Sequence, residues 1–362
     1  MSDPLDWLRP EITALKAYHV PAATGLVKLD AMENPYRWPA EMIQAWQTEL
    51  AHIAVNRYPD PQAPALKTAL RESMGIPQQA EVLLGNGSDE LIQMLVLALA
   101  RPGAIVLAPE PSFAMYKLTA EVCGMQYIGV PLRLDYALDT EAMLAALARH
   151  RPALVFIANP NNPTGNAFDA AGLRAIVEQA PGLVVLDEAY YPFTQANALA
   201  WLTEYPNLLV MRTVSKLGLA GLRLGLLCGS KAWLEQIDKT RLPYNINVLT
   251  QASVAFALGR AKVLAQQAAA IREERARLFA ELQRRAALTA YPSEANFILF
   301  RAPSGCADAL HTAVRAGGVL IKNLHGSHPM LTDCLRVTVG LPKENTIFLN
   351  ALDVALAKEP GK

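Results

Sequence analysis

A glycine-containing loop, Thr213–Gly225, holds the residues of this sequence that are best suited to chemistry. The amine of Lys216 can form a Schiff base with an aldehyde. Ser215, just before it, and Arg223, seven residues further on, can hydrogen-bond phosphate oxygens, the guanidinium with two bonds at once. The loop therefore suits an aldehyde cofactor that carries a phosphate. A solvated lysine beside a glycine-rich turn would give the same local pattern, so other parts of the chain must supply the partners.

Two apolar runs, Leu208–Met211 and Leu224–Cys228, flank this loop, which we therefore expect between two buried strands. From Val82 to Leu186 the chain alternates short apolar runs with helical patterns. Such alternation predicts an α/β fold in which helices on both sides cover a mainly parallel sheet. Ligands bind such sheets at the carboxyl ends of the strands.

Three of the expected strands are followed by residues that suit a flat, charged ligand. Phe113 comes soon after the run Ala104–Ala108, and its ring could lie against a planar group. Asn162 belongs to the rigid turn Asn159–Gly165, which presents side-chain amides. Asp187 ends an apolar run, so we expect it to be buried and to need a cationic partner. A pyridinium nitrogen would be such a partner, and a helix cap or a salt bridge is about as good an interpretation of this residue alone.

The junction Gly85–Glu90 is a candidate phosphate site. It connects a short strand, Val82–Leu84, to an apolar helix, so it offers glycines and the free N–H groups of a helix amino terminus. It lacks the third glycine of a dinucleotide fingerprint, which argues against that class of ligand. An ordinary helix cap by Ser88 or Asp89 is the alternative interpretation.

Composition excludes several classes of function. The 33 basic and 33 acidic residues cancel, so no global field attracts nucleic acid or an anionic membrane. The longest apolar stretch, Leu91–Ala100, is too short to span a bilayer, and the amino terminus carries no signal region. The four cysteines form no Cys-x-x-Cys pair, which is typical of buried thiols in a reducing compartment. We therefore expect a cytoplasmic protein that binds neither nucleic acid nor membrane.

Length indicates more than one domain, because 362 residues with 52% hydrophobic content exceed one ordinary core. We expect an amino-terminal arm (1–45), a large ligand-binding domain (46–250) and a smaller α+β domain (251–362) that the arm completes. Arg336 interrupts a strand-like apolar run in the small domain, either facing an anion or extending to the surface. His325 and His328 have no third ligand nearby, so we expect no metal.

Taken together, these motifs resemble the fold-type I pyridoxal-phosphate aminotransferases, and more closely the histidinol-phosphate aminotransferase family. They occur in the family's order and span most of the chain. The matching stretches are Glu33–Tyr36, Arg57–Pro59, Gly87–Glu90, Pro160–Gly165, Asp187–Tyr190, Ser215–Lys216, Gly221–Arg223, Asn296–Leu299 and Leu335–Gly340.

The resemblance implies roles around the cofactor ring. Lys216 would hold pyridoxal phosphate as a Schiff base and then move the proton during catalysis. Asp187 would pair with the pyridine nitrogen, while Asn162 and Tyr190 would hydrogen-bond the ring oxygen. Phe113 would stack on the ring where the family more often has tyrosine.

The resemblance also implies a shared site for the cofactor phosphate. Ser215, Arg223 and the backbone at Ser88 and Asp89 would hold the phosphate, and Tyr58 would reach it from the partner subunit. A homodimer with shared active sites follows from this arrangement.

For substrates, the resemblance implies transamination of L-histidinol phosphate in histidine biosynthesis. The acceptor 2-oxoglutarate would become glutamate, and the donor would become imidazole acetol phosphate. Arg336 and Tyr18 would surround the donor's phosphate, with Asn34 and Asn162 also contacting substrate. Lys322 stands where the family often has arginine, and a lysine cannot make the same bidentate clamp.

Two alternatives share the scaffold. An aromatic amino-acid aminotransferase would use phenylalanine as well as or better than histidinol phosphate. A threonine-phosphate decarboxylase-like lyase would release carbon dioxide without needing an oxoacid.

Overall fold

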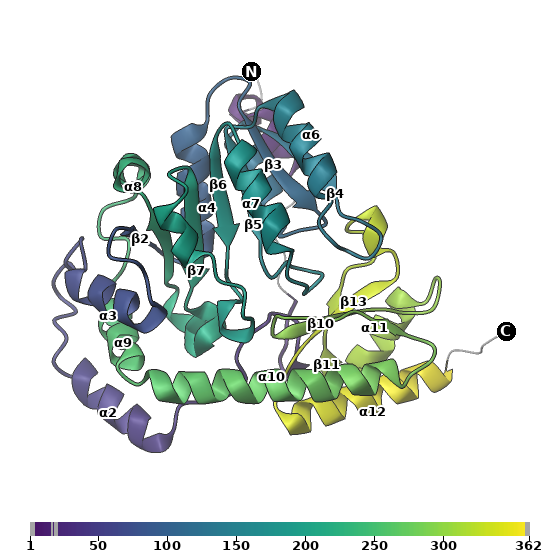
Figure 1. Ribbon diagram of the computed structural model, residues 1–362. Coiled ribbons are helices and arrows are strands. Elements are labelled where there is room, and N and C mark those ends of the chain that lie inside the picture. Colours follow the sequence, from purple (N-terminus) through teal and green to yellow (C-terminus); the bar gives the residue numbers. More distant parts are fainter. Residues whose placement is uncertain (1–3, 16, 18–20, 359–362) are drawn as a thin grey trace.

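The computed structural model describes residues 4–15, 17 and 21–358 (Figure 1). In the described chain, the centre is a seven-stranded sheet in the order β2-β8-β7-β6-β5-β3-β4. Its strands are β2 (Glu81–Gly85), β3 (Ile105–Glu110), β4 (Gln126–Pro131), β5 (Leu154–Ala158), β6 (Leu183–Asp187), β7 (Leu208–Thr213) and β8 (Gly225–Gly229). Strands β4, β3, β5, β6 and β7 are parallel, whereas β8 is antiparallel to both of its neighbours. The mainly parallel sheet expected from the sequence is confirmed.

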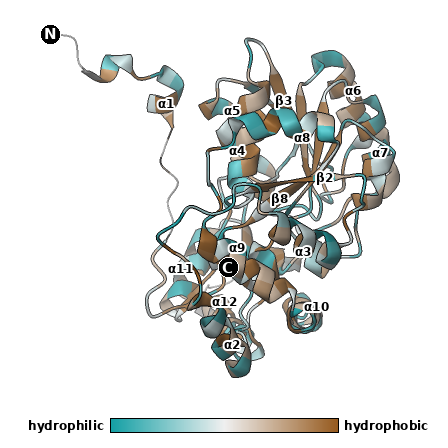
Figure 2. Ribbon diagram, turned by 90° about the vertical axis from the view of Figure 1, so that its left-hand side faces the viewer, coloured by the Kyte–Doolittle hydropathy of each residue, from teal (hydrophilic) through white to brown (hydrophobic). Residues whose placement is uncertain are grey.

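The central strands are buried along their whole length because helices cover both faces of the sheet. In β5, Val155 and Ile157 face the core shared with α3, α6, α7 and α9, and Leu154 and Phe156 face the core shared with α4, α5 and α8. These helices are α3 (Pro64–Met74), α4 (Ser88–Leu99), α5 (Met115–Val122), α6 (Thr140–His150), α7 (Ala170–Gln179), α8 (Lys231–Ile237) and α9 (Val248–Leu258). Continuous apolar runs are what such doubly covered strands require. Figure 2 shows the strands as hydrophobic elements enclosed between helices.

The small domain contains, within the described residues, a four-stranded antiparallel sheet in the order β12-β13-β10-β9. Its strands are β9 (Thr289–Ala290), β10 (Phe297–Arg301), β12 (Lys322–Asn323) and β13 (Cys334–Thr338). Buried residues of α10 (Ala261–Gln283), α11 (Ala307–Ala316) and α12 (Pro342–Lys358) pack in the same core. The long helix α10 runs along the base of both parts of the molecule (Figure 1).

The amino-terminal segment completes the small domain and then crosses to the large sheet. Strand β1 (Val27–Lys28) pairs in parallel with β11 (Val319–Leu320). Helix α2 (Ala40–Leu50) packs against α9. Helix α1 (Pro10–Ala14) lies at the outer edge of the molecule, where Arg9 donates a hydrogen bond to the carbonyl of Val122 in α5 (Figure 2).

The sequence pattern did not predict helix α9. It is apolar or small on almost every side because it packs between α2, α3 and the large sheet, so it shows no amphipathic period. The domain boundary expected between residues 250 and 251 lies inside this helix. We propose that the two domains divide at Gly259, between α9 and α10.

Within the described residues, no single helix is both long enough and apolar enough to cross a membrane. Helices α9 and α10 meet that test only as a pair, and they are bent by 77° at their junction.

A buried ion pair near the carboxyl ends of β6 and β7 gives a test of stability. Arg212 donates from Nε and Nη2 to one oxygen of Glu188, at 2.9 and 2.7 Å, and both side chains are almost inaccessible to water. Arg212→Ala leaves the carboxylate buried and unpaired, so we expect a loss of about 3–5 kcal/mol in the free energy of unfolding. Urea unfolding of the cofactor-free protein, followed by tryptophan fluorescence, measures this loss.

The matched control is Lys231→Ala, because Lys231 pairs with Glu235 on the exposed surface of α8. We expect no measurable change from this variant. Equal losses in the two variants would contradict the assignment of stability to the buried pair.

Candidate functional site

A cavity of about 340 Å³ opens at the carboxyl ends of the parallel strands, where the amino-terminal segment crosses the large sheet. Most of the residues singled out from the sequence line it. The lining side chains include Met32, Glu33, Ser88, Asp89, Phe113, Asn162, Asp187, Tyr190, Thr213, Ser215, Lys216 and Arg223. Residues separated by almost 200 positions in the chain therefore meet in one place.

Lys216 lies in a one-turn π-helix, Ser215–Leu219. This turn is part of the connection between β7 and β8, where the sequence predicts a loop between two buried strands. Its Nζ lies 3.3 Å from the carbonyl oxygen of Ala31 and 5.9 Å from the ring centre of Tyr190. Removal of the amine from water, assisted by the nearby cation of Arg336, lowers the pKa of Lys216 to about 8. A lysine with such a pKa is partly unprotonated near neutral pH and can attack a carbonyl.

The amino terminus of α4 forms an open cradle for an anion. Its cap residue is Gly87, with φ of +83°, and in the described structure no side chain caps the first turn. The first-turn N–H groups of Ser88 and Asp89 therefore stay available to a ligand, and the alternative of an ordinary cap by these two residues is not seen. A Cβ at position 87 would lie 2.6 Å from Nη2 of Arg223, so only glycine allows the guanidinium this close. We call this group, Gly87–Asp89 with Arg223, the phosphate cradle.

Ser215 lies at the inner side of the cavity and is oriented by Thr213. The Oγ1 of Thr213 donates to Oγ of Ser215 at 2.9 Å and accepts from the backbone N–H of Ser215 at 3.1 Å. Arg223 is half exposed, with Nη2 3.5 Å from a carboxylate oxygen of Asp89. An ion pair this exposed and this long leaves the guanidinium able to bind an incoming anion.

Asp187 ends β6 with 4% of its surface exposed. Its Oδ2 accepts a hydrogen bond from the hydroxyl of Tyr116 at 2.7 Å, and its Oδ1 accepts one from the N–H of Ala189 at 3.0 Å. Burial raises the pKa of Asp187 to about 6, although both hydrogen bonds act in the opposite direction. No cationic side chain among the described residues is bonded to this carboxylate, so it has room for a cationic ligand atom.

A chain of hydrogen bonds connects the cavity, at Tyr190 and Asn162, to the small domain. Asn162 Nδ2 donates to the hydroxyl of Tyr190 at 3.1 Å, and Asn162 Oδ1 accepts from Arg336. Arg336 also donates to the carbonyl of Asp30 at 3.0 Å, and its guanidinium lies 5.1 Å from the ring centre of Phe297. Arg336 is buried, so it does not extend to the surface; it lies outside the cavity lining and reaches the site through its bond to Asn162.

Four other residues named from the sequence lie apart from the cavity or outside the described residues. Tyr58 is 80% exposed and stacks on Tyr244. Asn34 lies outside the cavity lining, and its amide is bonded to Gln267 and to the backbone of Leu217 and Tyr36. Lys322, half-buried on β12, is paired in register with Arg336. Tyr18 lies outside the described residues.

Sequence reasoning missed two residues that organise the site. Tyr116 is fully buried on α5, stacked on Phe156, and its position three residues after Phe113 gave no sign that it reaches Asp187. Thr213 begins the Lys216 loop, and nothing in its position indicates that it orients Ser215. In the described residues, no three His, Cys, Asp or Glu side chains group as metal ligands.

Pyridoxal phosphate fits these residues. Lys216 would receive its aldehyde, the unpaired Asp187 its pyridinium nitrogen, and the phosphate cradle its phosphate. The fold and the site together define a pyridoxal-phosphate-dependent enzyme of fold type I.

Residues 24–352 match the family "aminotransferase class I and II". The chain is 56% identical to histidinol-phosphate aminotransferase 2 of Nitrosococcus oceani over 346 residues, which cover 96% of each chain. It therefore belongs to the histidinol-phosphate aminotransferase family.

Solved structures share the fold at lower identity. The crystal structure of histidinol-phosphate aminotransferase from Sinorhizobium meliloti in complex with pyridoxal-5'-phosphate gives a TM-score of 0.87 at 24% identity, covering 97% of this chain and 98% of that one. The L-threonine-O-3-phosphate decarboxylase of Porphyromonas gingivalis gives 0.77 at 20% identity, covering 92% and 100%. The fold alone therefore does not separate transamination from decarboxylation.

The contact between Tyr116 and Asp187 predicts a change in ionisation. Because the hydroxyl stabilises the charged carboxylate, Tyr116→Phe should raise the pKa of Asp187 further above about 6, and less of the carboxylate should be ionised at pH 7. Carbon-13 NMR titration of aspartate-labelled, cofactor-free protein measures this shift. Tyr127→Phe is the matched control, because Tyr127 is a half-buried tyrosine that interacts with Glu110 instead. An unchanged titration of Asp187 in Tyr116→Phe would show that the hydroxyl does not support the charge.

The lowered pKa of Lys216 predicts how cofactor uptake depends on pH. Only the unprotonated amine attacks an aldehyde, so the rate of reconstitution with pyridoxal phosphate should rise through a midpoint at about pH 8. Removing the neighbouring cation in Arg336→Gln should move the midpoint upward, since Arg336 helps to lower the pKa. Stopped-flow absorbance measures the rate. A midpoint that stays the same in Arg336→Gln would exclude this electrostatic contribution.

Proposed function

We propose that this protein transfers the amino group of L-histidinol phosphate to 2-oxoglutarate, giving imidazole acetol phosphate and glutamate for histidine biosynthesis. The observation that carries the proposal is the 56% identity, over almost the whole chain, to a relative named histidinol-phosphate aminotransferase. All four cysteines, each in the described residues, are free thiols, in keeping with work in the reducing cytoplasm.

In this proposal each residue of the cavity has a separate task. Bound pyridoxal phosphate supplies the electron sink that makes the α-proton of an amine acidic. Asp187 would hold a proton on the ring nitrogen, since its carboxylate is buried without a cationic partner among the described residues. Lys216 Nζ would remove the α-proton of the donor, and its lowered pKa keeps part of the amine unprotonated. Asn162 and Tyr190, already bonded to each other, would orient the ring oxygen.

Anion recognition would rest on Arg336 and Lys322. The two residues are directly opposite on antiparallel strands, so their side chains leave the sheet on the same face. A paired arginine and lysine suit a doubly charged phosphate, and the two carboxylates of 2-oxoglutarate could use the same cations. The point charge of Lys322 makes this pair less selective for phosphate geometry than two arginines would be. Tyr18 and Asn34 would complete the substrate contacts, Asn34 through the backbone that it holds.

We further propose a homodimer in which Tyr58 reaches the cofactor phosphate of the partner. Tyr58 is 80% exposed, and two more exposed apolar side chains, Leu242 and Tyr244, lie on the segment against which it stacks. Large apolar side chains gathered on a surface are typical of a protein interface. A second copy of the chain would cover them.

The decisive measurement is the visible spectrum of the pyridoxal-phosphate-loaded protein with L-histidinol phosphate and no oxoacid. We expect the yellow colour of the lysine-bound cofactor to disappear as the amino group is transferred, and 2-oxoglutarate to restore it. Lys216→Ala, which lacks the amine, should undergo no such cycle.

Loss of the yellow colour with phenylalanine but not with histidinol phosphate would favour an aromatic aminotransferase. Carbon dioxide released from threonine phosphate without an oxoacid would favour a lyase, and either result would contradict the proposal.

A further inference from the structure

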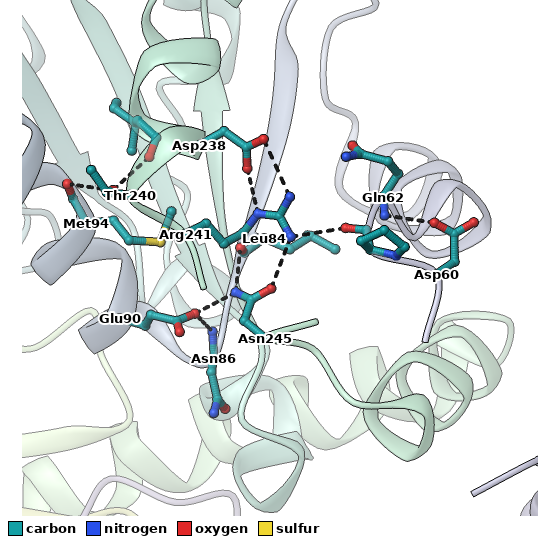
Figure 3. Close-up of polar contacts among 12 residues, drawn as sticks. Asp60, Gln62, Leu84, Asn86, Glu90, Met94, Asp238, Thr240, Arg241 and Asn245 are labelled. Carbon is teal, nitrogen blue, oxygen red and sulfur yellow. Dashed lines mark hydrogen bonds and ion pairs between the residues drawn. The ribbon is translucent and has the colours of Figure 1, made fainter. Parts of the chain in front are cut away.

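The segment Arg241–Asn245, between α8 and α9, contacts two parts of the chain that carry phosphate-binding residues (Figure 3). We call it the linking segment. None of its residues lines the cavity of its own subunit. Its side chains bond to the end of β2 and the first turn of α4 on one side, and contact Tyr58 and Pro61 on the other.

On the first side, Asn245 supports the phosphate cradle. Its Nδ2 donates to Oε2 of Glu90 at 2.7 Å and to the carbonyl of Leu84 at 3.3 Å. The same Glu90 oxygen accepts the N–H of Asn86 at 2.6 Å, so Glu90 reaches back from the first turn of α4 to the residue before Gly87 (Figure 3). This bond fixes the backbone that brings Gly87 against Arg223 and leaves the first-turn N–H groups open. Asn245 thereby holds Glu90 in the orientation that the cradle needs.

On the second side, the linking segment holds Tyr58. The ring of Tyr244 stacks on that of Tyr58, with centres 4.4 Å apart and an angle of 15° between the planes. Arg241 Nη1 donates to the carbonyl of Pro61 at 3.1 Å, and its Nε is held by Asp238 at 2.5 Å. Since Tyr58 is otherwise largely exposed, the stack with Tyr244 is the ring contact that orients it within the described part of the subunit.

The two sides are joined within five residues. Arg241 Nη1 also reaches Oδ1 of Asn245 at 3.4 Å, a long but direct contact between the residues that flank Tyr244 (Figure 3). A displacement of Asn245 therefore reaches Glu90 and Tyr244 alike.

We propose that Asn245 is a positioning residue that links the phosphate cradle of its own subunit to the Tyr58 which that subunit lends to its partner. The proposal rests on the shared-site homodimer proposed above. In each dimer, one linking segment would then set phosphate contacts in two active sites. Cofactor bound in the phosphate cradle of one subunit would restrict the motion of that subunit's Tyr58, which contacts the cofactor of the partner. Cofactor binding at one site would therefore change the affinity of the other site.

The first experiment measures phosphate binding in Asn245→Ala, which removes both donors from Glu90 and Leu84. We expect the dissociation constant of pyridoxal phosphate to rise about tenfold, equivalent to ~1.4 kcal/mol, and the phosphorus NMR signal of the bound cofactor to shift. Asn207→Ala is the matched control, because Asn207 donates its amide to the carbonyl of Val177 far from the cavity. A control that weakens cofactor binding equally would overturn the proposal, since the effect would then be general loosening.

A double-mutant cycle tests whether Asn245 acts through Glu90. In a Glu90→Ala background, Asn245→Ala should change the dissociation constant by less than about twofold, because the shared route is already broken. Additive effects would overturn this step.

Mixed dimers test the link to the partner site. Two differently tagged chains are combined, a wild-type chain and a chain with Lys216→Ala plus Asn245→Ala, so that the wild-type subunit holds the one functional lysine. We expect this site to bind pyridoxal phosphate more weakly than in a mixed dimer whose second chain carries Lys216→Ala alone. Unchanged affinity would overturn the link between Asn245 and the partner site.

A second mixed dimer, in which one chain is wild type and the other carries Lys216→Ala plus Tyr58→Phe, shows whether Tyr58 is shared at all. No effect of Tyr58→Phe would overturn the proposal at its first step. Neither failure bears on whether the wild-type protein transaminates histidinol phosphate.

Discussion

The site depends on one buried carboxylate that the described protein leaves without a positive partner. Asp187 ends a fully buried strand, and only neutral donors, the hydroxyl of Tyr116 and the N–H of Ala189, hold it. A charge in such a place is costly unless a ligand cation compensates it. A ring that carries a proton on its nitrogen would supply that cation, as we propose for pyridoxal phosphate. Lys216, with its lowered pKa, and the residues of the uncapped helix terminus line the same cavity.

The interior of the fold was largely predictable because burial on both faces demands unbroken apolar runs. The apolar runs at 153–158, 183–186 and 208–211 form central parallel strands. Helix α9 was missed because apolar or small residues occupy almost every side of it, so its sequence carries no period that distinguishes a helix. Burial gives a clear signal for strands of this kind and an ambiguous one for helices.

Single residues of the site were predictable where they follow a strand, and not where they act through space. Lys216 and Phe113 follow strands and Asp187 ends one, and the parallel sheet brings those ends together. Tyr116 lies on a helix and touches Asp187 across 71 positions, a distance in the chain that local patterns cannot bridge. Arg336 was visible as a charge in an apolar run, yet its partners Asn162 and Asp30 lie 174 and 306 positions away in the chain. Tertiary contact, more than residue type, decided these roles.

The reversal of β8 has a consequence for how the site is built into the chain. In a sheet of purely parallel strands, the chain leaves the ligand edge after each strand and returns at the opposite end. Because β8 runs antiparallel to β7, with Thr213 opposite Gly225, both ends of the Lys216 loop stay at the ligand edge. One hairpin thus carries both Lys216, proposed to bind the cofactor aldehyde, and Arg223, proposed to bind its phosphate. Main-chain pairing at the base, Thr213 opposite Gly225, therefore keeps these two residues in one short loop beside the cavity.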